Sequence, residues 1–100
     1  MAARRPFSYK TVASGTVCFS GELTIFSAKE LQAVLLRLKK KREPEVLDLK
    51  GVKRLDGAAA QIFRALQKSL DRPLQFRNVP EVVRQNLVFV GFNPEQFERD

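Results

Sequence analysis

The side chains of this chain that could do chemistry are mostly charged, and cations outnumber anions. Its 100 residues include 18 lysines and arginines against 11 aspartates and glutamates, which gives a net charge of +7. There is no histidine, so no imidazole can act as a general base, activate a serine or cysteine, or bind a metal. No motif places a pair of carboxylates for acid–base work. We therefore expect a protein that is not an enzyme and that uses no cofactor or metal.

The single cysteine, Cys18, can neither form a disulfide within the chain nor build a zinc site alone. It follows Val17 and precedes Phe19 in a strand-like segment, which favours a small core residue. No run approaches the ~18 apolar residues of a membrane span. Arg4-Arg5 is followed by Pro6 and polar residues instead of the apolar stretch of a signal peptide. The sequence predicts a cytoplasmic protein that does not span a membrane.

Some of the cations could bind phosphate groups. Lys50, Lys53 and Arg54 precede a predicted helix start, where free backbone N–H groups also attract anions. A capping carboxylate at Asp56 opposes an anion there, and no glycine-rich phosphate loop is present. The net charge would attract nucleic acid nonspecifically, but the basic residues are scattered and the phenylalanines occupy apolar positions. A basic nucleic-acid-binding domain, or one that binds nucleotide weakly, stays open as the alternative function.

The elements that must position these side chains begin with a hairpin. We expect residues 1–6 to form a loose basic tail and residues 7–100 a single domain. Strands are predicted over 7–12 and 16–20, and the short turn at 13–15 makes them antiparallel.

The first helix carries two start signals. Ser27 and Glu30 have the spacing of a capping box, and Phe26 and Leu31 that of a hydrophobic staple. Apolar residues then recur at helical spacing until the basic run 39–42, which suits the negative end of the helix dipole.

The second half of the chain alternates strands and helices. Residues 46–49 form a buried strand, 50–55 a loop carrying Gly51, and Asp56 caps a second helix that ends at 71–73. There follow a strand over 74–77, a helix from Pro80 to about Phe89 with Val82, Val83 and Leu87 inward, and a helical turn beginning at Asn93-Pro94 and holding Phe97. Residues 87–90 also have strand composition, so the end of the third helix is left open.

The element order β-β-α-β-α-β-α predicts the fold class α/β. Each helix between strands is long enough for a right-handed crossover. The expected architecture is a four-stranded mixed sheet with three to four helices packed on it.

Several segments together resemble the STAS domain, the fold of anti-sigma factor antagonists and of the cytoplasmic modules of sulfate transporters. Gly21-Glu22-Leu23 precedes the first helix, and Asp48-Leu49-x-Gly51-Val52 leads to Leu55-Asp56 and an alanine-rich helix. The resemblance implies a non-enzymatic domain. In some members the loop and first helical turn after this Asp bind an anti-sigma kinase, which phosphorylates the Ser or Thr that follows it and releases the partner.

The sequence departs from that pattern at the acceptor position. Gly57 follows Asp56, and no hydroxyl occurs before Gln61, so phosphorylation cannot be the switch there. Thr24 stands where the family often has Asp, so a carboxylate that could contact the partner is missing. Ser20 and Ser27 remain as hydroxyls, and we expect neither to be modified.

The second helix offers a surface for another protein. Gly57, Gln61, Arg64 and Lys68 lie opposite the apolar stripe formed by Ala59, Ile62, Phe63, Leu66 and Leu70. The predicted partner-binding residues are Asp56, Gly57, Ala58, Ala60, Gln61, Arg64 and Lys68. Small residues allow a close approach and the cations can pair with acidic groups. The resemblance leaves two partners open, an anti-sigma factor or kinase and the ATPase of a lipid-trafficking ABC transporter.

Overall fold

The computed structural model describes residues 6–13 and 15–98, and this part of the chain begins with the predicted hairpin. Strand β1 (Phe7–Ala13) pairs antiparallel with β2 (Thr16–Leu23). Of the predicted turn, Ser14 lies outside the described residues, and so does the predicted tail except for Pro6. The Pro6 carbonyl accepts a hydrogen bond from the Glu22 N–H at 2.8 Å.

The described residues form one four-stranded mixed sheet in the order β1-β2-β3-β4. Strand β3 (Val46–Leu55) lies parallel to β2 and to β4 (Gln75–Arg77), so the predicted α/β fold with a mixed sheet is confirmed. A bridge between Phe76 and Phe97 continues beyond β4, and the Glu98 N–H donates to the Phe76 carbonyl at 2.8 Å.

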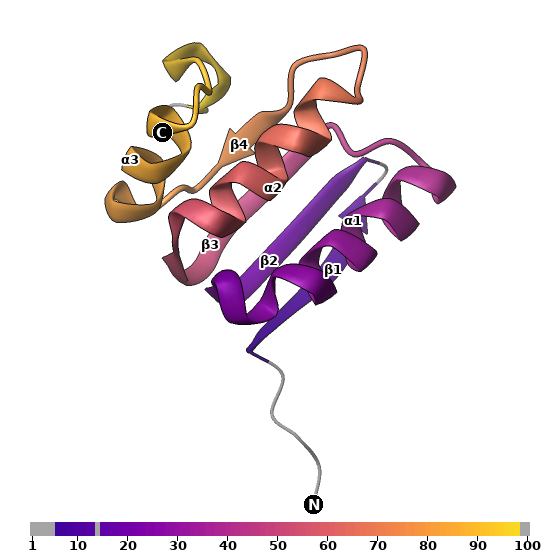
Figure 1. Cartoon of the computed structure of the whole chain (residues 1–100). Helices are drawn as coiled ribbons and strands as arrows, with labels where there is room; N and C mark the ends of the chain where they lie inside the picture. The colour runs from indigo at the N-terminus through magenta and orange to yellow at the C-terminus, as the bar shows by residue number, and fades with distance from the viewer. Residues whose placement is uncertain (1–5, 14, 99–100) are drawn as a thin grey trace, which may run out of the picture.

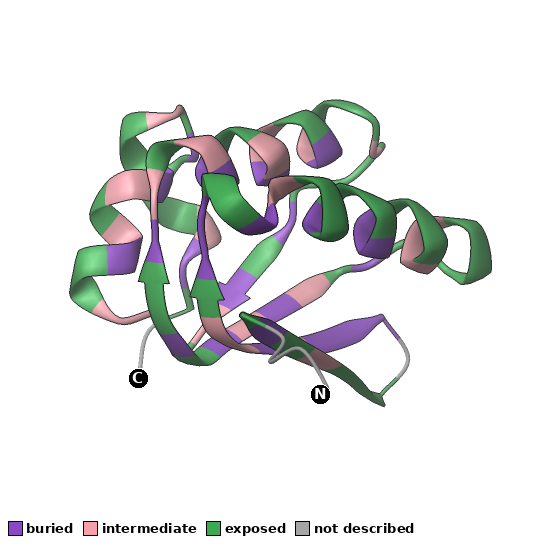
Figure 2. Cartoon of the chain, turned by 60° about the horizontal axis from the view of Figure 1, so that its bottom comes forward, coloured by how far each residue is buried: buried purple, intermediate pink, exposed green. Residues whose placement is uncertain are grey.

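Helices α1 (Ala28–Lys41) and α2 (Gly57–Lys68) cover one face of the sheet, as Figure 1 shows. Helix α3 (Glu81–Phe89) lies at the side of α2 away from α1 and ends where the sequence predicted. Two short 3₁₀ turns, η1 (Ile25–Ser27) and η2 (Pro94–Gln96), complete these elements. The burial pattern in Figure 2 places the core between the helices and the sheet.

Aromatic rings organise that core. Phe19 of β2 meets Phe63 of α2 edge to face, with ring centroids 5.7 Å apart. Phe76 of β4 packs edge to face on Phe92 and stacks on Phe97, at 4.8 and 5.2 Å. These contacts attach α2 and the C-terminal segment to the sheet.

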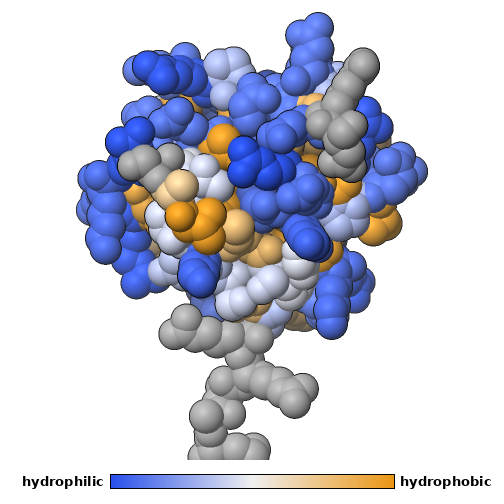
Figure 3. Space-filling model, turned by 180° about the vertical axis from the view of Figure 1, so that it is seen from behind, coloured by the Kyte–Doolittle hydropathy of each residue, from blue (hydrophilic) through white to orange (hydrophobic). Residues whose placement is uncertain are grey.

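The opposite face of the sheet carries no helix in the described part of the chain. Figure 3 shows this rear surface as largely hydrophilic, with a small apolar area. Cys18 is half-buried there, in register with Lys10 and Asp48. Its predicted place in the core is therefore wrong, because strand alternation puts Val17 and Phe19 on the helix-covered side and Cys18 on the other.

The predicted loop over residues 50–55 is wrong, because β3 continues to Leu55. Its register against β2 shifts between the pairs Cys18–Asp48 and Ser20–Gly51, as a bulge does. A Cβ on Gly51 would lie 2.6 Å from that of Ser20, so the strands approach here only because Gly51 lacks one.

The predicted capping box between Ser27 and Glu30 is also wrong. Ser27 is the N-cap of α1 but makes no side-chain cap bond to it. Its hydroxyl instead accepts from the Thr24 N–H at 3.1 Å, completing a capping box around η1. Phe26 is 95% exposed, so the staple with Leu31 does not form.

Val82 of α3, predicted to point inward, is 61% exposed, whereas Val83 and Leu87 are buried as predicted. No helix of residues 6–13 and 15–98 is both long and apolar enough to cross a membrane.

Candidate docking site at the start of α2

Asp56 fixes the start of α2, as the sequence predicts. Its Oδ1 accepts from the Ala59 N–H at 3.0 Å, which is the N-cap bond. Its Oδ2 accepts from the Ile25 N–H at 2.9 Å, and so ties η1 to the same point. Both carboxylate oxygens are thus engaged within the chain, and Asp56 positions the site.

Gly57 begins the exposed face of α2. A Cβ built on it would meet no described atom within 4 Å. Ala58 beside it is half-buried, and Gln61 one turn later is exposed. The first turn therefore presents a small, uncharged surface that another chain could approach closely.

The second half of α2 adds cations. Lys68 is exposed, whereas Arg64 is half-buried and places its guanidinium carbon 5.9 Å from the centre of the Phe92 ring. This cation–π contact holds Arg64 against the C-terminal segment. We call Gly57, Ala58, Gln61, Arg64 and Lys68 the α2 docking surface.

Ala60 does not belong to that surface. It was expected to flank the outward stripe, but it is fully buried in the core. On the helical wheel, residue 60 lies at the border between the outward and the buried face of α2. Whether such a residue is buried depends on the elements that pack beside the helix. Helices α1 and α3 pack along the two sides of α2 and leave a narrower strip exposed than an isolated helix would have.

The three cations proposed for anion binding do not come together. Lys50 lies on the rear of the sheet, where it lines a shallow pocket of about 570 Å³ with Lys10 and Asp48. Lys53 and Arg54 are exposed near the end of β3, and Arg54 stands in register with Glu22. As the sequence predicted, the capping bond of Asp56 uses the Ala59 N–H, so the start of α2 has fewer free donors for a phosphate.

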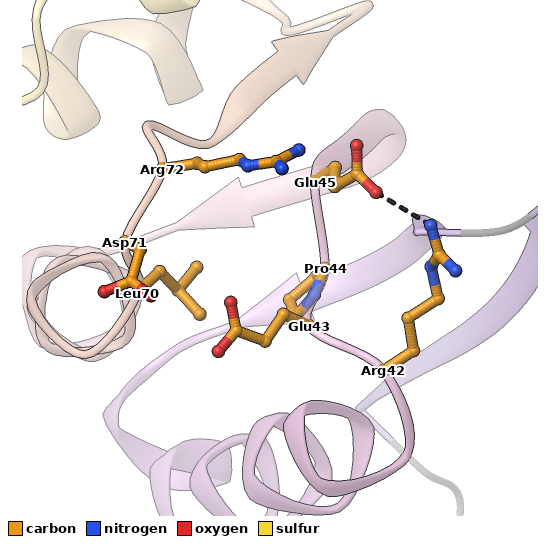
Figure 4. A pocket seen from close by; sticks show the side chains of 7 residues that line it. All are labelled: Arg42, Glu43, Pro44, Glu45, Leu70, Asp71 and Arg72. Carbon is orange, nitrogen blue, oxygen red and sulfur yellow. Dashed lines mark hydrogen bonds and ion pairs between the residues drawn. The ribbon is translucent and has the colours of Figure 1, made fainter.

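A second pocket, of about 330 Å³, lies at the far end of the two long helices. Figure 4 shows Arg72 pointing toward Glu45, which Arg42 holds in an ion pair of 3.0 Å. Its lining combines cations with carboxylates such as Glu43, and it contains none of the residues predicted to act. No group of three or more potential metal ligands occurs in residues 6–13 and 15–98.

The sequence analysis missed two exposed phenylalanines close to this site. Phe26 of η1 is 95% exposed and Phe89 at the end of α3 is 88% exposed. Apolar spacing suggested a staple for Phe26 and did not single out Phe89. In the sequence, each of these phenylalanines stands at one end of a predicted helix, which is the only feature that could have pointed to it. The structure shows that neither ring is buried in the core.

The chain is thus an α/β module with helices on one face of its sheet, and the first turn of α2 is exposed and carries small side chains. The sequence profile of the family described as "Mlab, STAS domain" matches residues 9–94, and the chain belongs to this STAS family, as the resemblance suggested.

Two solved structures share the fold. The anti-sigma factor antagonist SpoIIAA in its unphosphorylated form is 15% identical with a TM-score of 0.66, covering 92% of this chain and 85% of that one. The Bacillus cell fate determinant SpoIIAA in the phosphorylated form is 18% identical with a TM-score of 0.59, covering 92% and 88%. No curated protein matches the chain closely enough to be compared.

Proposed function

We propose that this chain is a non-catalytic protein-docking module that binds its partner through the α2 docking surface. The observation that carries the proposal is the surroundings of Gly57. The residue is exposed at the first turn of α2, and the space where its side chain would be is open. A partner backbone can enter that space, whereas the charges of Arg64 and Lys68 lie further along the helix for pairing.

Docking at this surface is not controlled by phosphorylation. The position after Asp56 holds a glycine, and α2 contains no residue with a hydroxyl group. The next hydroxyl along the chain is that of Ser69, immediately after the helix. SpoIIAA is described in both unphosphorylated and phosphorylated forms, and the present chain lacks the group that such a change would need at this position.

Two partners fit such a module. The likeness to an anti-sigma factor antagonist supports an anti-sigma factor. The ATPase of a lipid-trafficking ABC transporter is the second partner that the STAS resemblance leaves open. The missing acceptor hydroxyl favours the ABC-transporter ATPase as the partner, because the module would stabilise this ATPase without being phosphorylated. Either partner places the chain in the cytoplasm, where residues 7–100 act as a single domain.

Substitution of Gly57 by tryptophan tests the docking surface. The bulky ring would fill the open space, so Gly57→Trp should abolish capture of the partner protein while the melting temperature stays within about 2 °C of the original. Ala33→Trp, at an exposed position of α1, is the matched control and should bind normally. Unimpaired binding by Gly57→Trp would rule out this surface. The identity of the captured protein, an ABC ATPase or an anti-sigma kinase, decides between the partners.

A further inference from the structure

We infer that Phe26 and Phe89 are two aromatic anchors that extend the α2 docking surface on both sides, and that they insert into apolar sockets of an acidic partner protein. This inference rests on the proposed docking function and names further residues for it. It begins from two large rings that this chain leaves in solvent although it buries Phe7, Phe19 and Phe63.

The position of Phe26 is fixed by the Asp56 carboxylate. The Ile25 N–H donates to Asp56 Oδ2 at 2.9 Å, which holds η1 against the start of α2. Phe26 is the next residue, and its own N–H donates to Thr24 Oγ1 at 3.3 Å. The backbone of η1 is thus bonded at Ile25 and at Phe26 itself, so a partner would meet the ring at a defined place near the start of α2.

The position of Phe89 follows from two contacts on the other side of α2. Asn86 Nδ2 donates to the Leu55 carbonyl at 2.7 Å, immediately before α2 begins. A Cβ on Gly91 would lie 3.3 Å from Arg64 Nε, two turns along α2. Phe89 is the last residue of α3 and lies between Asn86 and Gly91 in the sequence, so this end of α3 lies beside the first two turns of α2. Figure 1 shows α1 with η1 on one side of α2 and α3 on the other.

The chemistry of the partner follows from what surrounds these rings. Between them lies the uncharged surface of Gly57 and Ala58, which a protein backbone can approach closely. Exposed aromatic residues that enter desolvated pockets are typical anchors of protein interfaces. Cations outnumber carboxylates around this area, where Lys29, Lys53, Arg54 and Arg64 stand against Glu22, Glu30 and Asp56. A partner that complements the area carries carboxylates around its apolar sockets.

Alanine substitutions at the two rings test the inference. The partner is first isolated by its dependence on Gly57, as a purified protein bound by the full chain and not by Gly57→Trp. Titration by calorimetry should then show that Phe26→Ala and Phe89→Ala each weaken its binding by about 10- to 30-fold. Leu36→Ala removes a side chain that is 62% exposed on the outer side of α1, and it should leave the affinity unchanged.

The outcomes separate the inference from the proposed function. If Gly57→Trp abolishes binding while both alanine variants bind normally, the anchors are ruled out and the α2 docking surface stands. If no protein binds in a way that depends on Gly57, both the proposed docking function and the inference about the two aromatic anchors are ruled out. Vesicles of anionic phospholipid are the remaining occupant to test, and binding to them that requires Phe26 and Phe89 would assign the rings to a membrane surface and overturn the inference.

Discussion

Asp56 shows how one side chain can position two elements at once. Its two oxygens accept from two backbone N–H groups that lie far apart in the sequence, those of Ile25 and Ala59. The first bond places η1 and the second starts α2. Asp56 therefore has a structural role in the chain, and its predicted contact with a partner, like that of Gly57, stays a prediction.

Substitutions of Asp56 should separate the two bonds by their effect on stability. Asp56→Ala removes both acceptors and should lower the free energy of unfolding by about 2 kcal/mol. Asp56→Asn keeps one acceptor oxygen and should lower it by about half as much. Urea unfolding measures both changes, with Asp71→Ala, at an exposed position after α2, as the control. Equal stability of Asp56→Ala and the original chain would mean that neither bond contributes.

Gly57 also determines whether the chain can be phosphorylated at the start of α2. Gly57→Ser should fold normally, because its Cβ meets no described atom within 4 Å. Incubated with an anti-sigma kinase and ATP, the original chain should give no phosphopeptide from the start of α2 by mass spectrometry. Modification of Gly57→Ser alone would point to an anti-sigma factor as the partner of this chain. A phosphate on the original chain at a hydroxyl next to the α2 docking surface, such as that of the exposed Ser69, that releases the partner would contradict unswitched docking.

At the scale of the element, the entry into α1 depends on η1. The Ser27 hydroxyl is buried and bonds the backbone of Thr24, while Glu30 is exposed. We expect Ser27→Ala to lower the free energy of unfolding by about 1–2 kcal/mol and Glu30→Ala to change it by less than about 0.5 kcal/mol. A larger loss for Glu30→Ala would restore the capping box that the sequence suggested.

These two residues also show what the sequence could predict. The helix itself, and the role of Asp56 as a cap, follow from apolar spacing and local hydrogen bonding, which a short segment determines by itself. The choice between two overlapping capping boxes does not, because Thr24-to-Ser27 and Ser27-to-Glu30 have the same spacing. The structure has the first box, together with a bond from the Ile25 N–H to Asp56 that joins residues from different elements and that no short segment predicts.

The same reason explains the errors at Gly51 and Ala60. A glycine inside a polar stretch suggests a loop, and only pairing with β2 reveals a bulged strand. Residue 60 lies at the margin of the helical wheel, and its burial depends on how close α1 and α3 approach. The strip of α2 around Gly57, Gln61 and Lys68 was predictable because it faces directly away from the sheet.

The bulge gives a prediction with an internal control. Gly51→Ala would force a Cβ into the space of Ser20 and should lower the free energy of unfolding by about 1–3 kcal/mol. Gly57→Ala makes the same chemical change where there is room, and it should be neutral or slightly stabilising. Thermal unfolding of both proteins measures the difference. Equal melting temperatures would show that β2 and β3 can separate at the bulge without loss.

At the scale of the whole molecule, the net charge of +7 can act on a partner in two ways. A general positive field speeds encounter with any acidic surface, whereas local complementarity depends on where the cations lie. Lys53-Arg54 lies just before Asp56, and Lys40-Lys41 lies at the opposite end of the helix layer, where α1 ends.

Reversing these two pairs distinguishes the two effects. The double variants Lys53→Glu with Arg54→Glu and Lys40→Glu with Lys41→Glu change the net charge equally. If the partner docks at the start of α2, the first variant should slow association by about 10-fold at low salt and reduce its salt dependence, while the second should change it by less than about threefold. Stopped-flow association at two ionic strengths measures both. Equal slowing would mean that overall charge steers the encounter, and stronger slowing by the second variant would move the docking surface to the other end of the molecule.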